Sequence, residues 1–209
     1  TAIGKAPSPP LSSAVRQGNR VRLLAHLLVA IAVAVATGLG TAWWMLSAGP
    51  PFGAVHRGAW VTWPKAGRGD ADPYFRAVEA RRGVAPLGSG EGLTFLATRD
   101  DSGAPLDAAC TYRVEGTMPP TRLWTLAASD TEGRGFDNPA GRVGFHSREI
   151  LRREDGSFAI TLARSVQPGN WLPLGSGPML LTLRLYDTPL TESGVEDAKL
   201  PAVVRVACS

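Results

Sequence analysis

The chain has 209 residues, of which 44% are hydrophobic, and a formal net charge of +4 at pH 7. That excess comes from the four basic residues that precede the first long apolar run, which are Lys5, Arg16, Arg20 and Arg22; the remainder carries equal numbers of basic and acidic residues. The sequence pI of about 9.5 is therefore no argument for a nucleic-acid-binding protein, and no basic stretch is interleaved with aromatic residues as in a single-strand binder.

Residues 1–22 form a basic segment rich in Pro, Ser and Ala, and no acidic residue occurs in the chain before Asp70. A segment of this composition cannot bury enough apolar surface to fold alone. We therefore predict a basic cytoplasmic tail over residues 1–22 that is disordered unless a partner orders it.

Residues 23–46 read LLAHLLVAIAVAVATGLGTAWWML and contain no Asp, Glu, Lys or Arg. About 20 apolar residues in a helix span the hydrocarbon core of a bilayer, so this run predicts one transmembrane helix. A cleaved signal peptide usually has an apolar region of only about 7–15 residues, and a buried core helix should show a polar face. We expect the helix to be retained, with the initiator Met lost in the cytosol before Thr1.

The flanks of this run predict its direction across the membrane. Basic residues hold the nearer end of a spanning helix in the cytoplasm. Arg20 and Arg22 are thus expected at the inner interface, and Trp43 and Trp44 at the outer headgroup level, where indole rings are favoured. This places the protein in the bacterial inner membrane, with its N-terminus cytoplasmic and its C-terminal domain periplasmic.

The rest of the chain predicts a linker over residues 47–57 and one periplasmic domain over residues 58–209. A strand is expected at 58–63, and Asp72 followed by Pro73 predicts the start of the domain's one helix, which Gly83 ends. The segment 149–153 could form a single helical turn. Period-two patterns and turn residues predict further strands at 93–98, 109–115, 122–129, 142–147, 157–164, 178–186 and 202–207. This spacing is typical of a mainly β, jelly-roll-like antiparallel β-sandwich.

Two cysteines, Cys110 and Cys208, both follow the apolar run. In an oxidising compartment they most simply form one disulfide, which closes a loop worth about 4–5 kcal/mol in the chain-entropy model. Two free buried thiols are the alternative. No CxxC pattern accompanies them, so no metal site is predicted.

Several sequence blocks in the C-terminal half share the spacing of one family. They are GFHSRE at 144–149, DGS at 155–157, PGNWLP at 168–173, GP at 177–178 and LRLY at 183–186. Roughly residues 115–207 resemble the bacterial domain of unknown function 1214. The resemblance implies a jelly-roll-like sandwich and no settled reaction. Members often carry a second, upstream domain, where this chain has its apolar helix and linker.

Polar and aromatic side chains within these blocks are the candidate pocket residues, namely His146, Arg148, Asn170, Trp171, Arg184 and Tyr186. An arginine could bind an anion there, Trp171 could stack on a ligand, and His146 could act as a base. Structural roles are favoured, because Asn170 follows a glycine in a turn pattern and Arg184 and Tyr186 alternate with leucines. No paired carboxylates stand nearby, which argues against a glycosidase site. We predict no catalytic residue and no cofactor.

The sequence thus favours a non-catalytic accessory or scaffolding subunit of a larger bacterial membrane complex, such as a respiratory or photosynthetic one. Its expected partners are the lipid bilayer and integral-membrane proteins that contact the tail and the helix, where the small residues Gly38 and Gly40 allow close approach. No nucleic acid is expected. The alternative is a tethered periplasmic enzyme or ligand-binding domain that acts on carbohydrate or envelope components.

Overall fold

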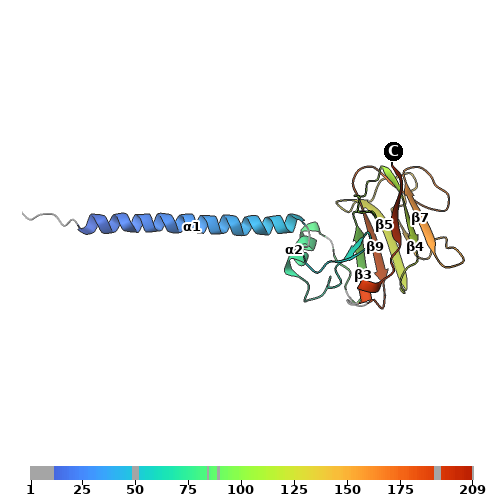
Figure 1. The fold of residues 1–209 in the computed structure, drawn as a ribbon, viewed down its shortest axis with the longest axis horizontal. Coiled ribbons are helices and arrows are strands. Elements are labelled where there is room, and N and C mark those ends of the chain that lie inside the picture. Colours follow the sequence, from blue (N-terminus) through green and yellow to red (C-terminus); the bar gives the residue numbers. More distant parts are fainter. Residues whose placement is uncertain (1–11, 49–51, 84, 89, 191–193, 209) are drawn as a thin grey trace, which may run out of the picture. The chain divides into compact units, whose positions relative to one another are not determined.

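The computed structural model divides the chain into two units, one ending at Ala48 and the other beginning at Gly49. It describes residues 12–48, 52–83, 85–88, 90–190 and 194–208 (Figure 1). Residues 1–11 of the predicted tail therefore lie outside the described residues.

The first unit contains one long helix, α1, which covers Ser12–Ala48. Its part from Arg20 to Ser47 has 28 residues and is long and apolar enough to cross a membrane, with none of it buried. At about 1.5 Å per residue this part is about 42 Å long, close to the thickness of a whole bilayer. The helix also takes in the second half of the predicted tail, because a helix that has already formed gains one backbone hydrogen bond for each residue it adds.

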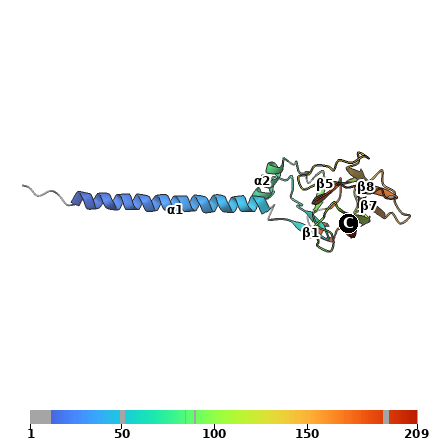
Figure 2. The ribbon, with the colours of Figure 1, turned by 90° about the horizontal axis from the view of Figure 1, so that it is seen from above.

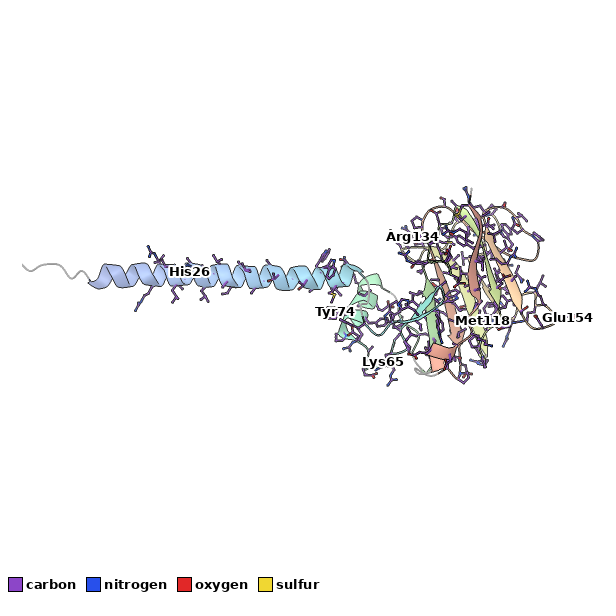
Figure 3. The ribbon with its side chains drawn as sticks, viewed as in Figure 1. His26, Lys65, Tyr74, Met118, Arg134 and Glu154 are labelled. Atoms are coloured by element: carbon purple, nitrogen blue, oxygen red, sulfur yellow. A yellow bond between two sulfur atoms is a disulfide. The ribbon has the colours of Figure 1, made fainter. Side chains whose placement is uncertain are left out.

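The few polar side chains of the apolar segment bond to the helix itself. The hydroxyls of Thr37, Thr41 and Ser47 donate to backbone carbonyls four residues earlier. The hydroxyl oxygen of Thr41 lies 2.8 Å from Thr37 O, and that of Ser47 lies 2.8 Å from Trp43 O. Side chains project from all sides of this helix, with His26 among them (Figure 3). Because hydrocarbon offers no hydrogen-bond partners, such back-bonding suits a lipid environment.

The second unit is a sandwich of two β-sheets, which confirms the predicted fold class (Figures 1 and 2). The larger sheet has the order β1-β2-β3-β9-β5-β6 and the smaller β10-β4-β7-β8. Neighbouring strands are antiparallel except β7 and β8, which run parallel. The strands are β1 Val55–Arg57, β2 Trp60–Thr62, β3 Gly92–Ala97, β4 Cys110–Gly116, β5 Leu123–Asp130, β6 Gly144–His146, β7 Phe158–Ala163, β8 Asn170–Pro173, β9 Met179–Tyr186 and β10 Ala202–Cys208.

The core lies between the sheets and follows the alternation of the strands. Along β9 every second residue from Met179 to Leu185 is buried, and Leu183 sits between Phe95 of β3 and Leu126 of β5. Trp124 of the large sheet stacks on Phe158 of the small sheet, with ring centroids 5.1 Å apart. This alternation is the pattern that the LTLRLY segment predicts.

The predicted helix at residue 73 is α2, Pro73–Arg82. The carboxylate of Asp72 accepts hydrogen bonds from the backbone N–H groups of Tyr74 and Phe75, the second and third residues of the helix, at 2.9 and 3.1 Å. Gly83 ends the helix in the left-handed conformation, which glycine adopts without steric cost. Phe75 and Val78 are buried, so one face of α2 packs on the domain.

Four elements differ from the prediction. Residues 149–153, all described, form no helical turn, and part of the predicted linker is instead strand β1. The predicted turn at Asn170 is strand β8, which pairs with β7. A short 3-10 helix, η1 (Gly194–Asp197), adds to the one predicted helix. Strands β1 and β8 have only three and four residues and depend on pairing with another strand, which leaves little local pattern.

Cys110 and Cys208 form a disulfide between β4 and β10, across a sequence separation of 98 residues. The predicted pairing is confirmed, and the alternative of two free thiols is wrong. The bond fastens the last strand of the chain to the centre of the small sheet.

Candidate functional site

The structure divides the six candidate pocket residues between the two sheets. His146 ends β6 and Arg184 and Tyr186 belong to β9, all in the large sheet, whereas Asn170 and Trp171 belong to β8 in the small one. Arg148 lies two residues after the end of β6. Among the described residues, no hydrogen bond or ion pair joins the large-sheet group to the small-sheet pair. The six side chains therefore do not line one common pocket.

Part of the large-sheet group does form a row on the outer face of that sheet. Thr125 of β5 lies opposite His146 on one side and Arg184 on the other, and Arg184 lies opposite Thr94 of β3. His146 is exposed, and its Nε2 lies 3.6 Å from a carboxylate oxygen of Glu149. The row is a polar strip on a sheet surface rather than an enclosed site.

The small-sheet pair is bonded to the backbone. The buried amide of Asn170 accepts a hydrogen bond from Leu151 N–H at 2.8 Å and donates to Leu151 O at 2.8 Å and Ala159 O at 3.0 Å. The indole N–H of Trp171 donates to Ala163 O at 2.9 Å. Asn170 thus holds the β6–β7 loop against β7, and both side chains have structural roles.

A hollow of about 450 Å³ opens between the β4–β5 loop and the β6–β7 loop, and none of the six candidate residues lines it. Figure 3 labels Met118 and Glu154, which belong to these two loops. The lining includes Met118, Thr121, Arg122, Trp124, Ser147, Arg152 and Asp155. Sequence reasoning missed this place, although Pro119-Pro120 beside two hydroxyls and an arginine marks a rigid polar loop.

Arg152 is the best-positioned charge of this hollow. Its guanidinium lies 6.0 Å from the ring of Trp124 and 5.9 Å from that of Phe158, and it donates to Gly156 O at 3.2 Å. Contacts of this kind orient the guanidinium and leave some of its five N–H donors for a ligand.

Two further charges flank it. Arg122 pairs with Asp187 at 3.0 Å, and both side chains are largely exposed. Hydrogen bonds from the hydroxyl and the backbone N–H of Ser157 hold the pKa of Asp155 below its usual value. At neutral pH the hollow therefore presents two guanidiniums and one carboxylate, an arrangement that can bind an anionic or polar ligand but that holds no carboxyl poised to donate a proton.

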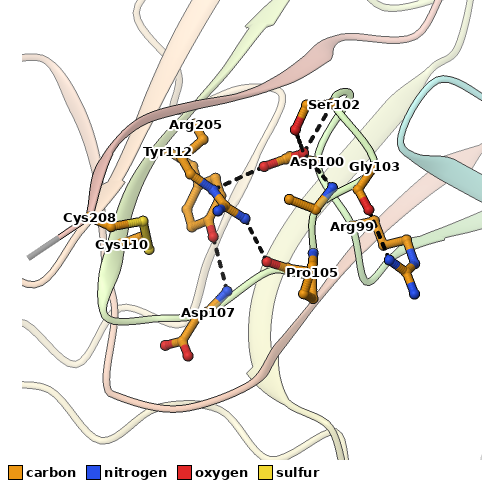
Figure 4. Close-up of polar contacts among 11 residues, drawn as sticks. Arg99, Asp100, Ser102, Gly103, Pro105, Asp107, Cys110, Tyr112, Arg205 and Cys208 are labelled. Atoms are coloured by element: carbon orange, nitrogen blue, oxygen red, sulfur yellow. Dashed lines mark hydrogen bonds and ion pairs between the residues drawn. A yellow bond between two sulfur atoms is a disulfide. The ribbon is translucent and has the colours of Figure 1, made fainter.

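A second network, around Asp100, fastens the β3–β4 turn to β10 (Figure 4). Oδ2 of Asp100 lies 3.0 Å from Nε of Arg205, and Oδ1 accepts from the backbone N–H groups of Ser102 and Ala104, each at 3.0 Å. Burial opposes ionisation of this carboxyl. The hydrogen bonds and the charge of Arg205 outweigh it and hold the pKa of Asp100 below its usual value. Arg205 also donates to Pro105 O at 2.6 Å.

No group of three or more His, Cys, Asp or Glu side chains able to hold a metal ion occurs within the part of the chain that the structure describes.

These observations define a class of protein, a disulfide-bonded two-sheet β-sandwich in a chain that also carries an apolar helix of membrane-spanning length. Residues 91–190 match the model of the family described as "Protein of unknown function (DUF1214)", so the chain is similar to that family over this segment. The predicted resemblance is confirmed, but the matched residues differ from the predicted range of roughly 115–207. The match begins earlier, before β3, and ends before β10.

Two solved structures are similar to this chain to different degrees. The VPA0106 protein from Vibrio parahaemolyticus is 21% identical, with a TM-score of 0.55 over 66% of this chain and 36% of its own. An uncharacterized protein from Burkholderia cenocepacia is 19% identical, with a TM-score of 0.41 over 72% of this chain and 36% of its own. The chain thus spans about a third of the length of either protein, and the first likeness shows a shared fold. No curated protein matches the chain.

Proposed function

We propose that the protein is a single-span protein of the bacterial inner membrane whose periplasmic β-sandwich acts as a non-catalytic accessory or scaffolding subunit of a larger membrane complex. The observation that carries the proposal is the helix segment Arg20–Ser47, which is 28 residues long and largely apolar and of which none is buried. In water such a surface would be strongly unfavourable, whereas lipid or a neighbouring helix covers it at no such cost.

Two independent features support the periplasmic side for the sandwich. Basic residues, among them Arg20 and Arg22, lie at the N-terminal end of the apolar segment, and such residues remain in the cytoplasm. The disulfide between Cys110 and Cys208 lies in the part of the chain that follows the apolar segment. Disulfides persist in oxidising compartments such as the periplasm.

A scaffolding role is supported by how the polar groups are used. The buried amide of Asn170 and the buried carboxylate of Asp100 bond to the domain itself, so their contacts build the fold. On α1, Gly38 and Gly40 carry no side chain, and small residues of this kind allow the helix of another protein to pack closely.

The orientation has a direct test with Cys208, which is exposed. After reduction, a membrane-impermeant maleimide is expected to label Cys208 in intact spheroplasts. A control cysteine at Ser8, in a Cys110→Ser/Cys208→Ser chain, is expected to react only after the inner membrane is opened. The reverse pattern for the two positions would show that the sandwich is cytoplasmic. Purification in mild detergent tests the accessory role, and a monomer under every mild condition would contradict it.

A second candidate function, ligand binding, is favoured by the hollow with Arg122 and Arg152. We expect a carboxylated sugar such as glucuronate to raise the melting temperature of the full chain in detergent, because a ligand at about 100 times its Kd adds about 2.7 kcal/mol. Arg122→Ala is expected to abolish the rise, while Arg164→Ala, an exposed arginine outside the hollow, leaves it unchanged. Absence of a shift in the wild-type chain would remove this candidate.

A further inference from the structure

Two aromatic side chains of the sandwich unit stand exposed beside the start of α2. Phe52 is 50% exposed and Tyr74 is 38% exposed, and their ring centroids lie 6.3 Å apart although 22 positions separate them in the sequence. Both lie outside the core, to which α2 contributes Phe75 and Val78 instead. The aromatic pair therefore forms a small apolar patch on the surface of this unit.

The position of the pair in the sequence limits how far it can move from a membrane. Ser47 ends the apolar segment, and Phe52 follows it by five positions. Five residues span at most about 18 Å even when fully extended. The headgroup layer on each side of the hydrocarbon is itself about 5–8 Å thick. If α1 spans the bilayer, Phe52 stays within about 18 Å of the end of the span in every conformation of the intervening chain.

The chemistry around the pair suits the membrane–water interface. Aromatic rings are favoured at headgroup depth, where one side is apolar and the other wet. Charged side chains of both signs, Lys65, Asp70 and Asp72, line one hollow together with Gly53 and Pro73, the chain neighbours of the pair. Such groups remain hydrated among zwitterionic headgroups. The tether keeps the effective concentration of the lipid surface high, so a weak affinity is sufficient.

We propose that the Phe52–Tyr74 pair is a lipid-contact surface through which the sandwich rests on the headgroup layer of the membrane that holds α1. The proposal rests on the proposed function, because it requires α1 to span that membrane. Its occupant is the lipid surface, and the contact limits the freedom of the domain to rotate and tilt above its anchor.

The test uses the full chain in phosphatidylcholine nanodiscs that contain a few nickel-chelating lipids. A nitroxide is attached to a cysteine at Ala77, which is exposed on α2 one turn after Tyr74, or at Val166 in the β7–β8 loop, or at Val33 in the span. The native cysteines are joined to each other and do not react. We expect headgroup nickel to relax the label at position 77 much more strongly than the label at position 166.

Removal of the patch supplies the decisive comparison. Phe52→Ser with Tyr74→Ser is expected to lower the ratio of docked to free domain about tenfold, a typical factor for two half-buried aromatic rings. Val143→Ser with Leu151→Ser removes two other exposed apolar side chains and is expected to change nothing. Since all four side chains are exposed, near-UV circular dichroism should confirm that each variant is folded.

Each outcome has one meaning. A strong nickel effect at position 77 that the aromatic double variant abolishes supports the proposal. Equal effects at positions 77 and 166, with the label at Val33 in the hydrocarbon, overturn it and leave the membrane anchor intact. A label at Val33 that lies outside the hydrocarbon overturns the proposed function and this proposal together.

Discussion

Replacement of Cys110 and Cys208 by serine is expected to lower the free energy of unfolding of the sandwich by about 4 kcal/mol, because the disulfide closes a loop of nearly a hundred residues in the unfolded chain. A domain of this size is stable by only about 5–15 kcal/mol in total. The measurement is urea unfolding of the full chain in mild detergent, followed by the fluorescence of Trp60 and Trp124, which are both buried.

Reduction supplies the control for this prediction. Dithiothreitol should destabilise the wild-type chain by the same amount as the double serine variant and should leave that variant unchanged. A loss below about 1 kcal/mol would mean that the unfolded chain is already restricted near these positions, contrary to the entropy model.

Asp100→Ala is expected to cost about 3 kcal/mol, because it leaves the guanidinium of Arg205 without its carboxylate partner in a partly buried place. The side chain of Asp100 is 1% exposed and that of Arg205 is 33% exposed. The same carboxylate organises its turn through the N–H groups of Ser102 and Ala104, and these would lose their acceptor. Urea unfolding measures the loss.

The chain contains a matched control for this substitution. Asp130 organises a turn of the same form, accepting from the N–H groups of Glu132 and Arg134 at 2.9 Å and pairing with the side chain of Arg134 at 2.8 Å. That guanidinium is 71% exposed, and exposed ion pairs contribute little. We therefore expect Asp130→Ala to destabilise the domain much less than Asp100→Ala. Equal losses of stability would show that Asp100 stabilises the domain through its turn and not through the buried ion pair.

Acid provides a second readout of the same interaction. Because the folded protein holds the pKa of Asp100 below its usual value of 3.8, its contribution to stability is complete above that value and is lost as the pH falls through the lower, folded value. The difference in stability between wild type and Asp100→Ala should therefore be constant near neutrality and shrink below about pH 4. A difference that does not change with pH would contradict the ion-pair account.

Comparison of the predicted and observed elements shows which features are local. The capping Asp72, the following Pro73 and the terminal Gly83 predicted α2 to within a residue, because each acts on its own backbone neighbours. The leucines of β9 predicted a buried face for the same reason. Charge and hydropathy likewise identified the apolar helix, whose match to a bilayer depends on length and composition alone.

The candidate pocket could not be predicted from neighbouring residues in the sequence. Residues drawn from neighbouring sequence blocks, such as Asn170 and Arg184, came to lie on different sheets, while the hollow is formed by Arg122 and Arg152 from two loops that the sequence does not relate. The sequence did not predict strand β8. This strand pairs in parallel with β7, from which a loop separates it, and such pairing leaves no local hairpin pattern.

The amino-acid sequence by itself determined the apolar helix, the capped helix α2, the alternation of the strands and the presence of one possible cysteine pair, since these follow from short-range sterics, hydrogen bonding and hydrophobic periodicity. Only the tertiary structure decided which strands pair, that Asp100 meets Arg205, and where the surface is hollowed. Those features join residues as far apart as a hundred positions, and no short-range interaction specifies which of the many distant partners is met.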